Sequence, residues 1–427
     1  MISAAVARRR YLGLLALRWL PVGLTIPVSV LILTQRGLSL GQVGLAVSAQ
    51  GLVVFALELP TGGLADAIGR RPVLTVATAI DAMALVAFLV ARNPSLLLGV
   101  YAAKGVSRAL DSGPLEAWFV DAALVDDPDA DYETTLAHGA SVLSAAIAVG
   151  ALASGGLVAL GDLGPVHGLS VPVVAAVLAD VVAVGALRRW MVEPRAERGR
   201  AALATGVRDV PRHVRTALHA VRTSRLLVSL VAVEVLWCFG MAAFELLMSP
   251  RLAEVLDSSH RAAAVFGPVT SAAWVASAVG AAAVPSLARR IGARRAGAVL
   301  RLGHGLTVGA MALAAGPIGL VVAYTLSYTV HGAANPVHQG LLHREVRGPE
   351  RVTVLSVNSM VGRPAAALGG VLLGSVADAA GIPTAMAIGA VVLAAAAPLY
   401  LVGREQRPPD PLTPPRPTSS GLAGAER

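Results

Sequence analysis

The chain has 427 residues, of which 55% are hydrophobic and only 14% are charged, and its mean hydropathy is +0.68. A soluble protein of this length needs more charge to cover its surface, so the composition excludes that class and indicates an integral membrane protein. The single cysteine, Cys238, excludes an intrachain disulfide framework and a metal site built of cysteines.

Apolar segments of membrane-spanning length recur along the whole chain. About 20 residues cross the roughly 30 Å hydrocarbon core of a bilayer. We count twelve such segments, at residues 11–34, 42–62, 73–91, 95–120, 136–160, 170–190, 226–249, 262–286, 296–315, 317–341, 352–375 and 381–403. The predicted fold is therefore all-α, with twelve transmembrane helices, and the abundant Gly and Ala inside the segments favour close packing of helices in a bundle.

The net charge of +9 invites a nucleic-acid-binding interpretation, but the distribution of the charge argues against it. Arginines gather in alternate loops, at residues 8–10, 70–71, 188–225, 289–295 and 344–351 and in the tail, whereas the opposite loops hold only Arg36, Arg92, Arg251 and Arg261. Cytoplasmic loops of membrane proteins carry this excess of Lys and Arg. We therefore predict a multi-pass protein of the cell membrane with both termini in the cytoplasm, surrounded by the lipid bilayer and not bound to nucleic acid.

The loop between the second and third predicted helices holds a compact motif, from Gly62 to Pro72. Its informative residues are Gly62, Asp66, Gly69, Arg70 and Arg71. Gly69 suits a turn with positive φ, and Asp66 can hold a neighbouring helix by charge-assisted hydrogen bonds. The motif resembles the cytoplasmic signature loop of the major facilitator superfamily, G-x-x-x-D-[RK]-x-G-[RK]-[RK], and departs from it at Ala67, where a basic residue is usual.

This resemblance implies that the motif residues take part in conformational gating at the cytoplasmic side. Glu58 lies directly before the motif in the 42–62 helix, and Arg18 lies in the 11–34 helix. We expect these two residues to form a structural or gating ion pair rather than a substrate contact. Replacing Asp66 by Asn is expected to impair transport and to leave membrane insertion intact.

The predicted helix over 95–120 carries the densest set of charges inside the membrane, each of which costs several kcal/mol unless it is paired or hydrated. At about 100° per residue, Lys104, Arg108 and Asp111 share one face, and Gly113-Pro114 is expected to kink the helix before Glu116. Arg108, Asp111 and Glu116 are candidates for proton coupling or substrate binding. The alternative is a structural ladder of ion pairs between helices.

Two features bear on the direction of transport. An Arg in the fourth helix resembles a signature of proton-coupled exporters in the superfamily, but the fuller R-x-x-Q-G form is absent because Asp111 and Ser112 stand in its place. The exporter signature G-P-x-x-G-G in the fifth helix is represented only by Gly155 and Gly156. The resemblance to exporters is therefore partial.

The chain divides into two related halves. Residues 64–71 align with residues 287–294, and the same offset aligns Tyr101 with Tyr324 and Glu116 with Gln339. The predicted organisation is a six-helix bundle at 1–190, a basic cytoplasmic linker at 191–225, a second, pseudo-symmetric six-helix bundle at 226–403 and a disordered cytoplasmic tail at 404–427. Duplicated bundles of this kind place the substrate site near the middle of the membrane between the halves.

The second half offers further candidates for proton coupling or substrate binding, on the helices at 226–249 and 317–341. They are Glu234, Trp237, Met241, Tyr324, His331 and Asn335. Glu234 and Glu245 share a face with Trp237 and Met241, and such a wall suits a cationic amphiphile or a titrating group. The alternatives are interhelical hydrogen bonds and packing for the helix at 317–341, and a solvated position near the outer interface for Glu245.

The resemblance implies a secondary active transporter that works by alternating access, and we favour proton-coupled efflux of hydrophobic or cationic small molecules. An uptake permease for a sugar or other metabolite is the alternative. An integral-membrane enzyme ranks lower, because H-E-x-x-H does not occur and the chain shows no other recognisable catalytic set, and a passive channel does not account for the twofold repeat. The expected partners are a small-molecule substrate and a proton gradient, with no cofactor and no metal, and the protein is expected to be a monomer.

Overall fold

A computed structural model of the chain describes residues 2–62, 64–193, 224–345 and 350–402, and for residues 58–60, 62, 66 and 350–357 it describes the backbone alone. Most of the predicted linker and the predicted tail lie outside these ranges. The side chains of Glu58 and Asp66, and the surroundings of Gly62, are also outside the described residues, so their gating roles stay predictions.

The described chain is almost entirely helical. The first half contains α1 (Ala4–Thr25), α2 (Ser29–Gln35), α3 (Leu40–Gly62), α4 (Leu64–Ile68), α5 (Arg70–Val90), α6 (Pro94–Asp111), α7 (Pro114–Asp126), α8 (Tyr132–Ala159), the short 3-10 helix η1 (Gly168–Ser170) and α9 (Val171–Trp190). The second half contains α11 (Arg225–Glu245), α12 (Met248–Leu256), α13 (Ser259–Ile291), α14 (Ala293–Leu313), α15 (Pro317–Glu345), α16 (Glu350–Ala380), α17 (Ile382–Ala395) and η2 (Pro398–Leu401).

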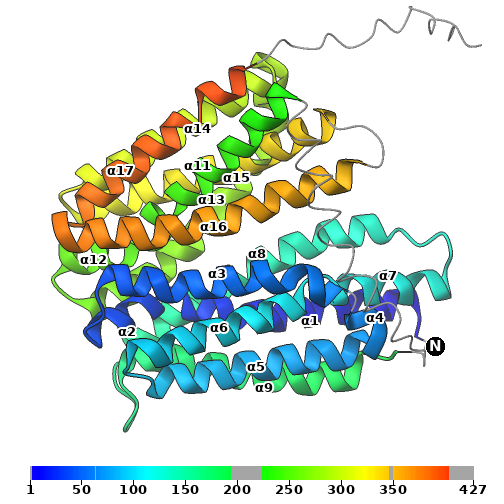
Figure 1. The fold of residues 1–427 in the computed structure, drawn as a ribbon. Coiled ribbons are helices and arrows are strands. Elements are labelled where there is room, and N and C mark those ends of the chain that lie inside the picture. Colours follow the sequence, from blue (N-terminus) through cyan, green and yellow to red (C-terminus); the bar gives the residue numbers. More distant parts are fainter. Residues whose placement is uncertain (1, 63, 194–223, 346–349, 403–427) are drawn as a thin grey trace, which may run out of the picture.

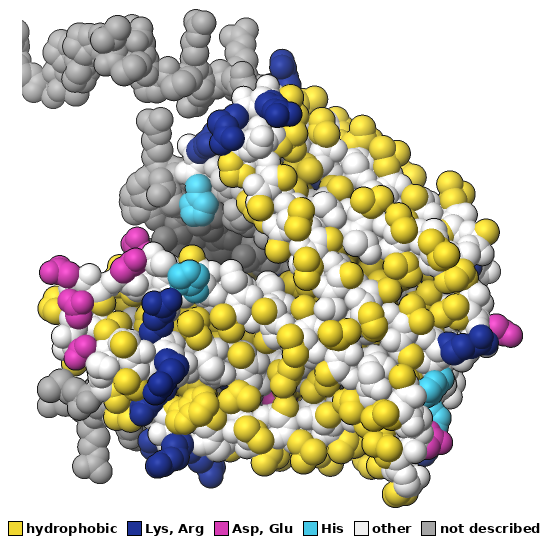
Figure 2. Space-filling view, turned by 180° about the vertical axis from the view of Figure 1, so that it is seen from behind, with side chains coloured by type: hydrophobic (Ala, Val, Ile, Leu, Met, Phe, Trp, Pro, Cys, Tyr) yellow, Lys and Arg dark blue, Asp and Glu magenta, His cyan; other side chains and the backbone are white. Residues whose placement is uncertain are grey.

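Twelve membrane-crossing helices form two bundles of six. Ten segments of the described chain are long and apolar enough to cross a membrane unaided. The other two are α6 and α15, whose polar side chains lower their hydropathy: α6 carries Lys104, Arg108 and Asp111. Figure 2 shows a broad hydrophobic surface over the middle of the molecule, with Lys and Arg gathered toward its ends. The all-α membrane fold predicted from the sequence is therefore confirmed.

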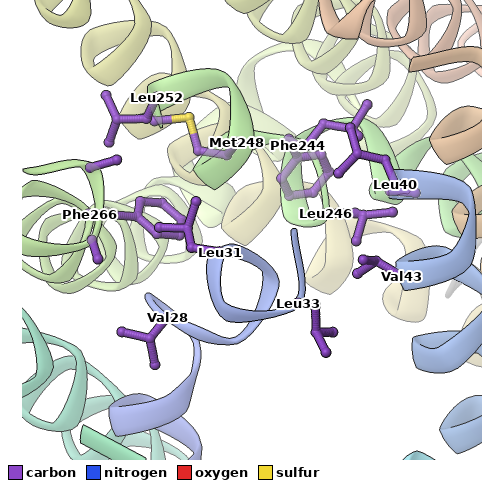
Figure 3. Packing of buried hydrophobic residues seen from close by; sticks show 14 of the residues in the cluster. Val28, Leu31, Leu33, Leu40, Val43, Phe244, Leu246, Met248, Leu252 and Phe266 are labelled. Carbon is purple, nitrogen blue, oxygen red and sulfur yellow. The ribbon is translucent and has the colours of Figure 1, made fainter. Parts of the chain in front are cut away.

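The two bundles meet at one end and separate at the other (Figure 1). At the end where they meet, here called the narrow end, side chains of α2 and α3 such as Leu31, Leu33 and Val43 share one buried cluster with Phe244 and Met248 of the second half (Figure 3). At the opposite end, here called the arginine-rich end because Arg8–Arg10, Arg70 and Arg289 lie there, each bundle has a buried cluster of its own. Among the described residues, the cores thus join the halves at one end only.

Glycines allow the backbones of the two halves to approach closely at the narrow end. A side chain at Gly44 of α3 would strike the carbonyl of Gly370 in α16, and α8 and α13 meet in the same way at Gly155 and Gly267. The Oγ of Ser48 also donates a hydrogen bond to the carbonyl of Ala367, at 2.8 Å. These two crossings, α3 on α16 and α8 on α13, form the main contact between the bundles.

The fourth predicted helix is broken rather than kinked. It ends as α6 at Asp111, and the chain starts again as α7 at Pro114. The residue before a proline disfavours helical backbone, and Gly113 adopts the left-handed conformation with φ of 92°. The expectation of one continuous helix over 95–120 is therefore wrong, and Glu116 belongs to a separate helix.

The turn expected at Gly69 is confirmed, since this glycine has φ of 100° and precedes α5. Gly292 has φ of 81° and stands at the matching point of the repeat, directly before α14. Arg70 and Arg71 begin α5, and the carboxylate of Glu193 accepts hydrogen bonds from both of their backbone N–H groups, at 2.6 and 3.3 Å. The Arg70 side chain forms an ion pair with Asp121 of α7.

Candidate substrate cavity

A cavity of about 510 Å³ lies between the halves. Both bundles line it: α1, α2, α3, α5, α6 and α9 on one side, and α11, α13, α15 and α16 on the other. Its volume is in the range of small-molecule sites, which run from about 300 to about 1,000 Å³. The cavity is therefore large enough for a drug-sized molecule held between two halves.

The wall contributed by the first half is charged, and most of its charges are paired with one another. Asp111 forms ion pairs with Arg18 of α1 and, at 3.4 Å, with Arg108 on its own helix. Lys104 pairs with Asp81 of α5 at 2.8 Å. These pairs reduce the cost of holding charges within the membrane.

Two further residues complete this wall. The guanidinium of Arg108 lies over the indole of Trp19, 3.9 Å from the ring centroid, which is cation–π geometry. Asp180 of α9 is only 3% exposed, and its Oδ2 has no hydrogen-bond partner among the described residues.

The ion pair between Arg18 and Asp111 was not expected from the sequence. The expected pairing of Arg18 with Glu58 stays a prediction.

The wall contributed by the second half is aromatic. Tyr324 and Tyr328 of α15 have ring centroids 4.9 Å apart, and Phe266 and Trp274 of α13 pack against them. The hydroxyl of Tyr328 donates a hydrogen bond of 2.9 Å to the carboxylate of Glu245. Glu245 lines the cavity and is exposed there, which agrees with the solvated position considered for it from the sequence.

One base on this side of the cavity is unpaired. Arg363 of α16 lines the cavity and has no ion pair among the described residues. The Sγ of Cys238, also in the lining, lies 3.6 Å from the Oε1 of Glu234, which stands behind the wall.

A cluster of buried and half-buried polar side chains lies behind the aromatic wall, within the second half. It comprises Glu234, Trp237, Arg301, His304, His331, His338, Asn358 and Tyr400. His338 is central to it: its Nε2 lies 3.4 Å from Glu234 Oε2 and its Nδ1 lies 3.0 Å from the Tyr400 hydroxyl. Arg301 is 1% exposed and lies over the indole of Trp237.

The candidate residues from the sequence fall into three places. Arg108, Asp111, Met241 and Tyr324 line the cavity. Glu234, Trp237 and His331 belong to the buried cluster behind it. Glu116 lies on α7 and Asn335 is exposed on α15, and neither is part of the cavity lining.

Three members of the buried cluster were not predicted from the sequence as candidate site residues, namely Arg301, His304 and Tyr400. Arg301 and His304 fall within the predicted span 296–315, and a polar group inside a membrane helix is the same signal that singled out the charges of 95–120. Tyr400 gave no such signal, because a tyrosine at the end of an apolar segment is ordinary.

Comparison with known proteins agrees with this architecture. The family model described as Major Facilitator Superfamily matches residues 12–363. Among solved structures, the nucleoside transporter NupG (a D323A mutant) is similar with a TM-score of 0.77 at 12% identity, covering 92% of this chain and 99% of that one. A bacterial homologue of the human lysosomal transporter Spinster, solved inward-facing and unoccupied, is similar with a TM-score of 0.71 at 15% identity, covering 93% and 96%.

No curated protein matches the chain. At 12–15% identity the solved structures show the fold alone. The family match covers most of the chain and agrees with the Gly62–Pro72 motif, the twelve helices and the cavity between two bundles. The chain belongs to the major facilitator superfamily.

Proposed function

We propose that this transporter is a proton-coupled exporter of hydrophobic or cationic small molecules, which bind in the cavity between the halves. The observation that carries the proposal is the Glu245 carboxylate, held by Tyr328 in an aromatic wall of that cavity. Alternating access moves such a site between the two faces of the membrane by rocking one bundle against the other.

The two walls favour a cation of low polarity. Aromatic faces attract cations, and Trp274, Tyr324 and Tyr328 line the cavity beside Glu245. The acids Asp81 and Asp111 on the opposite wall are already paired with bases. Asp180 and Glu245 both line the cavity without an ion pair among the described residues, but Asp180 is only 3% exposed, whereas Glu245 is exposed to the cavity and can neutralise a substrate.

Uptake of a polar metabolite is the second candidate function. The first half lines the cavity with hydrogen-bonding side chains, namely Thr25, Ser29, Ser48, Gln50, Thr78 and Ser107. A sugar or a nucleoside would use such groups, whereas a lipophilic cation would not.

The experiment that separates the two functions is substrate-induced thermal stabilisation of the purified protein. We expect tetraphenylphosphonium to raise the unfolding temperature of the wild type and to do so much less in Glu245→Gln. The matched control is Glu254→Gln, which removes an acid at the narrow end that pairs with Arg251 outside the large cavity. Stabilisation by sugars or nucleosides and none by the cation would contradict the export proposal and favour uptake.

A further inference from the structure

The pair formed by Glu234 and His338 sits in an unusual position for two titratable groups. Glu234 is 7% exposed and His338 is fully buried, yet their side chains approach to 3.4 Å. Glu234 comes from the middle of α11 and His338 from the last third of α15. A buried carboxylate must be compensated by a positive charge or a proton, because isolated charge in such surroundings is very costly.

Both ring nitrogens of His338 have hydrogen-bond partners, so the ring can form hydrogen bonds with Glu234 in either protonation state of that carboxyl. With Glu234 ionised, the Nε2–H of His338 donates to the carboxylate and Nδ1 accepts from the Tyr400 hydroxyl. With one more proton on the pair, the protonated carboxyl of Glu234 donates to Nε2, and the Nδ1–H of the neutral imidazole donates to the Tyr400 oxygen. The Oδ1 of Asn358 lies 3.4 Å from the same Nε2 and supports the first arrangement. The pair therefore gains or loses one proton without leaving His338 unbonded.

The groups around the pair come from every helix packed against it. They are Cys238 on α11, Arg301 and His304 on α14, His331 on α15, Asn358 and Arg363 on α16, and Tyr400 on η2. Arg301 is fully buried, and its guanidinium carries a permanent positive charge. Arg363 is exposed at the cavity, so within the buried cluster the charges of Arg301 and ionised Glu234 cancel, and protonation of the pair gives the cluster one net positive charge.

The same cluster holds several buried polar atoms that have no hydrogen-bond partner within the described part of the chain. They are Nε and Nη1 of Arg301, both ring nitrogens of His304, Nδ1 of His331 and the indole N–H of Trp237. Buried polar groups are generally bonded, to ordered water where protein partners are lacking. These donors and acceptors can bind ordered water molecules beside the titratable pair, and such water molecules can carry protons to it.

Cys238 links the pair to the cavity. Cys238 contacts Glu234 and lines the cavity, and Gly362 leaves the space that lets α16 lie against both of these side chains. His338 and Tyr400 are fully buried, so Glu234 is the member through which a proton enters. A proton therefore reaches the pair from the cavity that also binds the substrate.

From these contacts we infer that Glu234 and His338 form the proton-coupling site of the transporter, binding one proton in exchange for a cationic substrate. This inference rests on the proposed function. Glu234 and Glu245 are eleven residues apart on α11, which is about 16 Å along a helix. A proton on the pair and a cation at Glu245 repel each other, and at an effective dielectric constant of about 20 this weakens cation binding by about five-fold.

The titration of the pair can be followed directly in the protein without substrate. Infrared difference spectra between about pH 5 and about pH 8 should show the carbonyl band of a protonated carboxylic acid that is absent in Glu234→Gln. The band should titrate at a different pH in His338→Gln, which keeps a hydrogen-bonding side chain, while Glu345→Gln serves as the control acid at the end of α15. No difference band from Glu234 over this pH range would overturn the inference.

The link to transport needs a second readout. Binding of tetraphenylphosphonium to the wild type in weak buffer should release a fraction of one proton, and Glu234→Gln should release none and bind the cation about five-fold more weakly. The same variant should lose accumulation driven by a proton gradient while keeping exchange of labelled for unlabelled cation. If the wild type binds no cation, the proposed function fails, although the infrared titration of Glu234 is unaffected. If Glu234→Gln releases as many protons as the wild type, the assignment of the proton-coupling site to Glu234 and His338 is refuted and the proposed function is not.

Discussion

Asp111 organises the charges on the first-half wall. It lies at the last residue of α6 and binds Arg18 from α1 and Arg108 from its own helix. The side chain of Arg18 is 7% exposed, whereas that of Arg108 is 39% exposed. A buried partner contributes more to an ion pair than an exposed one, because solvent screens the latter. The Arg18–Asp111 pair is therefore expected to carry most of the stabilisation.

Replacing Arg18 by Met should destabilise the protein by about 3 kcal/mol, because it leaves the Asp111 carboxylate with only the more exposed Arg108. Thermal and denaturant unfolding in detergent would measure the loss. Arg92→Gln is the matched control, since Arg92 is exposed and has no ion pair among the described residues. Equal stability of the two variants would show that the pair contributes little.

The charged residues of the cavity could be predicted from the sequence, whereas most of their ion-pair partners could not. Lys104, Arg108 and Asp111 were placed on one face by helix geometry, and all of them line the cavity. The partner of Arg18 was not found, because Asp111 is distant in the sequence and the approach of α1 to α6 is set by tertiary packing. Nothing local in the sequence indicated that His338 meets Glu234.

At the scale of single elements, local rules decided the boundaries. Gly69 and Gly292 both have positive φ at the starts of α5 and α14, as the repeated motif predicts. Gly113-Pro114 was recognised as a disturbance but interpreted as a kink, since Pro alone bends a helix. The left-handed Gly113 adds a second interruption, and together they end α6. The length of the segment was predictable, and its continuity was not.

Glu193 is expected to stabilise the start of α5, because its carboxylate accepts two N–H groups that have no partner within the helix. Glu193→Ala should cost about 1 kcal/mol and should increase hydrogen exchange in the first turn of α5. Asp129→Ala, an exposed acid in the loop before α8, is the control. Unchanged exchange in that turn would show that Glu193 does not cap it.

At the scale of the whole molecule, the important asymmetry is that the described parts of the two halves share a core at the narrow end only. The carboxylate of Asp378 in α16 reinforces this contact, because it accepts hydrogen bonds from the backbone N–H groups of Leu40 and Gly41, each with an N···O distance of 2.8 Å. The twofold repeat predicted two bundles with a site between them. It did not predict which end is closed, because that depends on a balance of contacts between the halves.

Gly44→Val should disrupt closure of the narrow end, because the new side chain meets the backbone of Gly370. Spin labels at Leu160, directly after α8, and at Arg261 of α13, both exposed at this end, should move apart in a Cys238→Ala background. Gly99→Val is the control, since nothing lies within 4 Å of a side chain at Gly99. The same label distance in Gly44→Val and in the parent protein would refute the role of this contact.

The central claim is that two bundles rock about the cavity, and distances across both ends test it most directly. A second label pair at Ser141 of α8 and Ser286 of α13 reports on the arginine-rich end. On binding tetraphenylphosphonium, part of the population should show a shorter 141–286 distance together with a longer 160–261 distance. Alternating access would be contradicted if both distances stayed fixed during transport, or if both lengthened together as in an opening pore.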